Sequence, residues 1–88
     1  MKAEQFTDRH VSLLENVSYL KNLHLGRTKL SDAGLARIAQ LPGIYGLSIR
    51  STGVTDNGMK HVGQMKTLKI LDFPEQITDD GLAHLAEL

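Results

Sequence analysis

Three residues whose side chains could act together in catalysis recur at one spacing along the chain. His24, Ser48 and Asp72 are 24 residues apart and are the residue types of a serine-hydrolase triad. On three adjacent parallel strands they would form a row with the serine in the middle, and about 9–10 Å would separate His24 from Asp72. A working triad instead places histidine between serine and acid. We therefore predict a hydrogen-bonded polar row and no enzyme, with a hydrolase as a remote alternative.

The other reactive side chains do not predict a metal or cofactor site. His61 and His84 fall at one helix position on neighbouring predicted helices, whose axes would lie about 8–10 Å apart, and no third ligand accompanies them. The chain has no cysteine and no glycine-rich phosphate loop. Arg50 could bind a carboxylate or phosphate, although a diagonal ion pair with Asp72 is the expected alternative.

These residues lie on a sequence repeat. The segment 30–35, Leu-Ser-Asp-Ala-Gly-Leu, recurs at 54–59 as Val-Thr-Asp-Asn-Gly-Met and at 77–82 as Ile-Thr-Asp-Asp-Gly-Leu. A fainter copy, Phe-Thr-Asp-Arg-His-Val, stands at 6–11. The copies follow one another at 24, 24 and 23 residues. This periodicity predicts one domain over residues 1–88, with a partial first coil at 1–17 and coils at about 18–41, 42–65 and 66–88.

Each repeat divides into a strand and a helix. Alternating apolar residues predict strands around 23–25, 47–49 and 71–73, and apolar stripes predict helices over roughly 32–41, 56–65 and 79–88, with a first helix near 8–17. The predicted core comprises Leu23, Leu25, Leu47, Ile49, Leu71 and Phe73 from the strands, faced by Leu35, Ile38, Met59, Val62, Leu82 and Leu85.

The helix starts share a capping pattern. Thr7, Ser31, Thr55 and Thr78 occupy the N-cap, where a hydroxyl is expected to accept a hydrogen bond from a backbone N–H. An aspartate follows each of them and favours the positive end of the helix dipole. Gly34, Gly58 and Gly81 recur in the first helical turn, which predicts close backbone packing between coils. His10 departs from this pattern.

The motif LxxLxLxx(N/T)x followed by a TDxGL segment resembles the leucine-rich-repeat family, nearest to its ribonuclease-inhibitor-like, bacterial and F-box adaptor types. The resemblance covers residues 6–88. It implies an α/β fold, a right-handed solenoid with a short parallel sheet on the concave face and helices on the convex face. Thr28 and Thr52 stand where many members have asparagine, and the third loop is one residue short.

The resemblance also implies a non-enzymatic protein-interaction module that uses its concave face. The candidate partner-binding residues are Asn22, His24, Ser48, Arg50, Ile70 and Asp72, with Gly26, Gly46 and Pro74 completing the outward-facing rows. The alternative is a structural, self-assembling repeat block, or a fragment of a longer repeat protein. We predict no cofactor and no metal.

Charge and hydropathy bound the partners. Ten basic residues balance ten acidic ones, so no overall field favours nucleic acid, and no apolar run is long enough for a membrane span. We expect a cytoplasmic protein. Residues 1–69 carry ten basic and five acidic side chains and residues 70–88 carry five acidic and no basic ones. Neither end has an evident polar cap, which predicts end-on docking or self-association.

Overall fold

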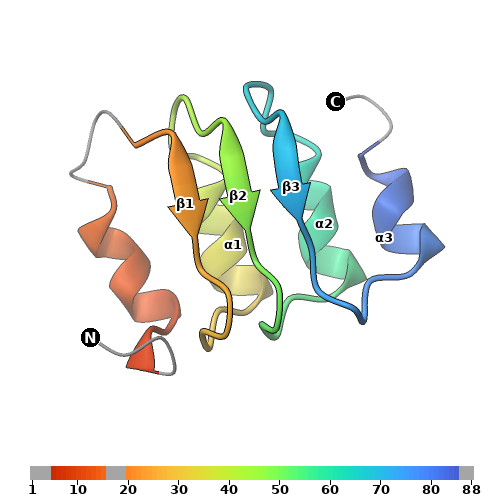
Figure 1. The fold of residues 1–88 in the computed structure, drawn as a ribbon, viewed down its shortest axis with the longest axis horizontal. Helices are drawn as coiled ribbons and strands as arrows, with labels where there is room; N and C mark the ends of the chain where they lie inside the picture. The colour runs from red at the N-terminus through yellow and green to blue at the C-terminus, as the bar shows by residue number, and fades with distance from the viewer. Residues whose placement is uncertain (1–4, 16–19, 86–88) are drawn as a thin grey trace.

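The computed structural model describes residues 5–15 and 20–85, which form a mixed α/β fold with a small three-stranded parallel sheet and four helices (Figure 1). The helices lie on one side of the sheet and leave the other side uncovered. In chain order the elements are the 3-10 helix η2 (Asp8–Leu13), β1 (Asn22–His24), α1 (Asp32–Ile38), β2 (Gly46–Ser48), α2 (Asp56–Val62), β3 (Ile70–Asp72) and α3 (Asp79–Ala83).

The sheet has the strand order β1-β2-β3, with both pairs parallel. Leu23 pairs with Leu47, and Leu47 pairs with Leu71, so the register follows the 24-residue spacing of the repeat. The ladder continues past the ends of the strands, because the N–H groups of Leu25 and Arg27 donate to the carbonyls of Ser48 and Arg50. The prediction of three parallel strands is confirmed.

The core lies between the sheet and the helices, as the alternating pattern predicts. Leu47 and Ile49 are buried from the sheet side, and Leu35, Ile38 and Met59 are buried from the helix side. The prediction was wrong for the third unit, where four side chains are only partly buried: Leu71, Phe73, Leu82 and Leu85. In a repeat fold each unit buries its apolar residues against the units on both sides. Within the described residues no strand pairs with the free edge of β3, so the third unit is covered on one side only.

The helices begin where the capping pattern predicts and end earlier. Ser31, Thr55 and Thr78 are the N-caps of α1, α2 and α3, yet α1 and α2 end at Ile38 and Val62, not at 41 and 65. Both helices close with the same tight turns, in which the N–H groups of Leu41 and Met65 donate to the carbonyls of Ile38 and Val62 three residues earlier. The first helix is a 3-10 helix. The predicted helix ends at 17 and 88 lie outside the described residues.

Neighbouring units are joined by an aspartate of one unit and the N-cap residue of the next. Asp32 accepts the Thr55 backbone N–H at 2.7 Å and the Thr55 hydroxyl at 2.5 Å, and Asp56 accepts the same groups of Thr78 at 2.8 and 2.5 Å. Asp8 accepts both groups of Ser31. We call these three contacts the aspartate junctions.

The junctions change the role predicted for the capping hydroxyls. Only the Thr78 hydroxyl also accepts from its own helix, from the N–H of Asp80 at 3.3 Å, whereas those of Ser31 and Thr55 make no such bond. The repeated glycines lie close to the preceding unit, although they approach a side chain and not the predicted backbone: a Cβ on Gly58 would come within 2.3 Å of an Asp32 carboxylate oxygen. Each junction therefore requires a hydroxyl, an aspartate and a glycine together.

Candidate binding face

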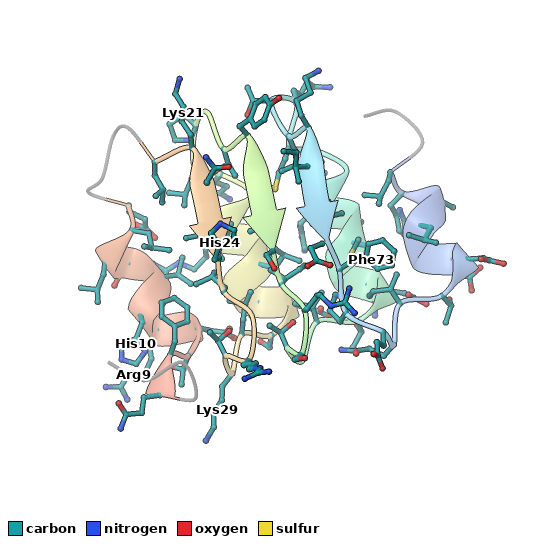
Figure 2. The ribbon with its side chains drawn as sticks, viewed as in Figure 1. Arg9, His10, Lys21, His24, Lys29 and Phe73 are labelled. Atoms are coloured by element: carbon teal, nitrogen blue, oxygen red, sulfur yellow. The ribbon has the colours of Figure 1, made fainter. Side chains whose placement is uncertain are left out.

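The side of the sheet turned away from the helices carries most of the predicted binding residues, and we call it the open face. Asn22, His24 and Arg50 are exposed there, and Ile70 is 58 % exposed. Figure 2 shows His24 at the end of β1 on this face. Ser48 and Asp72 are partly exposed.

Two residues predicted to point outward do not belong to the exposed part of this face. Pro74 is fully buried, because the chain turns after β3, where the Ile77 N–H donates to the Pro74 carbonyl at 3.2 Å. Gly46 is buried as well. The Asn22 amide leans over it, so closely that a Cβ on Gly46 would lie 2.5 Å from the Asn22 oxygen.

His24, Ser48 and Asp72 stand side by side, as their spacing predicts. The strand pairing places His24 opposite Ser48 and Ser48 opposite Asp72, and the Ser48 hydroxyl donates to Asp72 at 3.5 Å. His24 is the outer member of the row, so the serine lies between the histidine and the acid. This order does not match the serine–histidine–acid relay of a hydrolase.

Arg50 makes the diagonal ion pair that the sequence suggested. Its Nη1 donates to Asp72 Oδ1 at 3.0 Å, and both side chains stay about half exposed at 56 % and 46 %. A pair this exposed contributes little to stability, about 0–1 kcal/mol. In this contact the guanidinium lies beside Asp72, the last residue of β3.

Sequence reasoning missed Arg27 and Ser51, which follow the strands at the 24-residue spacing. Both have left-handed backbone angles, with φ of 63° and 58°. Neither residue is glycine or asparagine, the types in which this conformation is most common, so only their shared position in the repeat could have pointed to it. Their backbones carry two polar side chains to the edge of the open face.

The open face contains two hollows that share His24 and Ser48. The first, of about 270 Å³, lies over the strands and is lined by Asn22, His24, Gly46, Leu47, Ser48, Ile70 and Asp72. The second, of about 430 Å³, lies beyond the strand ends and is lined by His24, Gly26, Arg27, Ser48, Arg50 and Ser51. The first is mixed apolar and polar, while the second contains two arginines and no acid.

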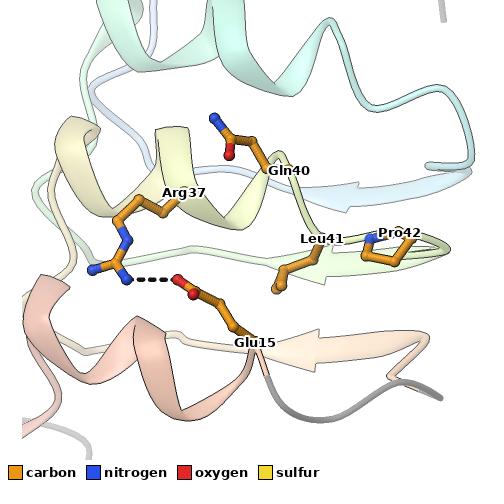
Figure 3. A pocket seen from close by; sticks show the side chains of 5 residues that line it. All are labelled: Glu15, Arg37, Gln40, Leu41 and Pro42. Atoms are coloured by element: carbon orange, nitrogen blue, oxygen red, sulfur yellow. Dashed lines mark hydrogen bonds and ion pairs between the residues drawn. The ribbon is translucent and has the colours of Figure 1, made fainter.

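The helix side carries a smaller hollow of about 260 Å³, lined by Glu15, Arg37, Gln40, Leu41 and Pro42 (Figure 3). The Arg37 guanidinium donates to Glu15 at 2.5 Å within it. This exposed pair joins the turn after η2 to α1. Its charges satisfy one another, so the hollow offers a ligand less free charge than the open face does.

The pKa of the Asp56 carboxyl, which belongs to an aspartate junction, is lowered. The Thr78 hydroxyl and the Thr78 backbone N–H, which both donate to Asp56, lower the pKa of its carboxyl, and the nearby His84 adds to this lowering. The shift has a structural cause and does not mark the open face as catalytic. Among residues 5–15 and 20–85, no three His, Asp or Glu side chains are grouped to hold a metal.

No protein-family model and no curated protein matches this chain. In the part of the chain that the structure describes, no helix has the length and apolar character needed to cross a bilayer.

Proposed function

We propose that the chain is a right-handed leucine-rich-repeat solenoid with the open face as its concave side. The parallel register at the repeat spacing supports this proposal, as do the aspartate junctions, which connect the TDxGL motif of one unit to the next. In such proteins each unit contacts only its neighbours. The repeated residues are therefore scaffold, and the residues that vary between units are left for recognition.

We further propose that this scaffold is a non-enzymatic module that binds another protein through the open face. The observation that carries the proposal is Ile70, a large apolar side chain left 58 % exposed beside the hollow over the strands. Protein contact surfaces typically have an apolar centre with a polar rim, and Asn22, His24 and Asp72 line the same hollow as Ile70. The proposed site of action is the cytoplasm, which suits a chain without cysteine.

A comparison of two charge variants in a capture experiment tests the interaction. The tagged chain is incubated with lysate of its source cells, beside Ile70→Arg on the open face and Lys60→Glu, an exposed position on α2. We expect Ile70→Arg to lose the proteins that the wild type retains and Lys60→Glu to keep them. Matching melting curves would show that both variants fold. The reverse pattern of losses would contradict the proposal and place the binding surface on the helices.

The second candidate is a self-assembling repeat block. The free edge of β3 favours it, since that edge has no partner strand in the described residues and unpaired edges recruit other strands. Leu71 and Phe73 are only partly buried beside this edge. Interaction with a second copy would cover both the edge and these side chains.

A further inference from the structure

The two hollows of the open face differ in chemistry along the direction of the strands. At the start of the strands, Ile70 is exposed beside the floor formed by Gly46 and Leu47. Beyond the strand ends, Arg27 and Arg50 line the second hollow with two serine hydroxyls. An apolar region and a cationic region therefore follow one another on one surface.

The cationic region has unused capacity for an anion. Within the described residues the Arg27 guanidinium has no hydrogen-bond or ion-pair partner, and Arg50 gives one bond to Asp72. A guanidinium has five N–H donors, so Arg50 can hold Asp72 and a second carboxylate together. Two arginines opposite one aspartate leave a net positive charge, and no acid lines this hollow.

The backbone fixes the distance between the two regions. The first row of side chains is at Asn22 and Ile70, and the cationic row begins four positions later, at Gly26 and Arg50. The ladder continues past the strands through the N–H of Leu25, and the chain turns at the cationic row itself, where Arg27 has a left-handed backbone. At about 3.3 Å per residue, four positions span about 13 Å, the same length as four residues of an extended peptide.

From this arrangement we infer that the open face binds an extended protein segment with an apolar side chain and an acidic side chain four residues apart. Even spacing puts both side chains on one side of the extended segment. The apolar side chain contacts Ile70, and the carboxylate binds Arg27 and Arg50. The inference rests on the proposed function and names the chemistry of its partner.

A displayed library of random octapeptides, selected on the full chain in low salt, tests this inference. The recovered peptides should share an apolar residue and Asp or Glu four positions apart. In synthetic copies, replacing that acid by its amide should weaken binding about tenfold or more, and Arg27→Glu should have a similar effect. Arg27→Lys should retain part of the affinity, Lys60→Glu should change nothing, and added salt should weaken binding by screening.

Different outcomes separate this inference from the proposed function. Peptides that need Ile70 but bind equally well as amides would overturn the acidic partner and leave the binding face standing. Peptides that bind Ile70→Arg as tightly as the wild type would overturn both. A library that yields no enriched sequence would overturn the inference, because the two regions would then not act as one peptide site.

Discussion

The middle of the molecule and its third unit carry the same motif in different surroundings. Asp32 accepts two hydrogen bonds from Thr55, whereas Asp79, the corresponding residue of the third unit, is exposed and has no such partner among the described residues. Leu47 is 2 % exposed, while Leu71 is only partly buried. The repeated residues stabilise the chain only where a following unit completes the contact, as expected of a one-dimensional repeat fold.

The first unit meets the same problem with a different residue. His10 stands where the later units have glycine, and its Nδ1 accepts the Thr7 backbone N–H at 3.0 Å. The Ser31 N–H, at the equivalent position, donates instead to an aspartate of the preceding unit. His10 therefore accepts the Thr7 N–H from within the first unit. In the later units the equivalent N–H donates to an aspartate of the preceding unit. Figure 2 shows His10 on η2, at the end of the molecule opposite α3.

The largest expected effect contrasts the two leucines. Leu47→Ala should lower the free energy of unfolding by about 2–5 kcal/mol, because it leaves a cavity in the core. Leu71→Ala should cost less, under about 2 kcal/mol, since water already reaches part of that side chain. Urea unfolding followed by circular dichroism measures both values. Equal losses would show that the third unit is as well covered as the second.

The aspartates give the next contrast. Asp32→Ala should lower the free energy of unfolding by about 1–2 kcal/mol, because the N–H and hydroxyl of Thr55 lose their charged acceptor. Asp79→Ala should stay within about 0.5 kcal/mol of the wild type. The same unfolding curves report both variants. A larger loss for Asp79→Ala than for Asp32→Ala would mean that the junctions do not join the units.

Much of this organisation follows from the sequence, and the parts that do not have physical reasons. The repeat spacing fixed the strand register, so the positions of His24, Ser48 and Asp72 relative to one another could be predicted. The aspartate junctions could not be predicted in this way. The N-cap pattern describes hydrogen bonds within one helix, whereas these bonds join neighbouring units. The position of Arg27 at the open face could not be predicted, because it depends on a left-handed backbone. That conformation is usually predicted only for glycine, asparagine or aspartate.

A smaller effect is the loss of stability at low pH when Asp56 is protonated. Hydrogen bonds from Thr78 lower the pKa of Asp56 below its ordinary value of 3.8, so the ionised junction stabilises the folded state fully above that pH. The contribution is lost as the pH falls from there through the lowered pKa of the folded state. Thr78→Val should move the Asp56 pKa back toward 3.8, as measured by NMR titration of the carboxyl carbon. An unchanged pKa would contradict the assigned cause.

The smallest expected effect is end-on association, which joins the two ends compared above. Stacking of copies would bring Asp79 of one copy to Thr7 of the next, but the Thr7 N–H is already held by His10, whose ring stands where a neighbouring carboxylate would lie. We therefore expect weak association of the wild type at high concentration and stronger association of His10→Gly. The basic majority of the chain and its acidic last residues would favour this head-to-tail contact, most of all in low salt.

Light scattering coupled to gel filtration, at low and high salt, measures the association. The control is the double variant His10→Gly/Asp79→Ala, which keeps the opened first unit but removes the acceptor that would join it. This double variant should return to the wild-type mass, since the Thr7 N–H would find no carboxylate on the next copy. A mass of 9.7 kDa for the wild type and His10→Gly at every concentration in both buffers would contradict end-on association, and the free edge of β3 would then have no role in pairing copies.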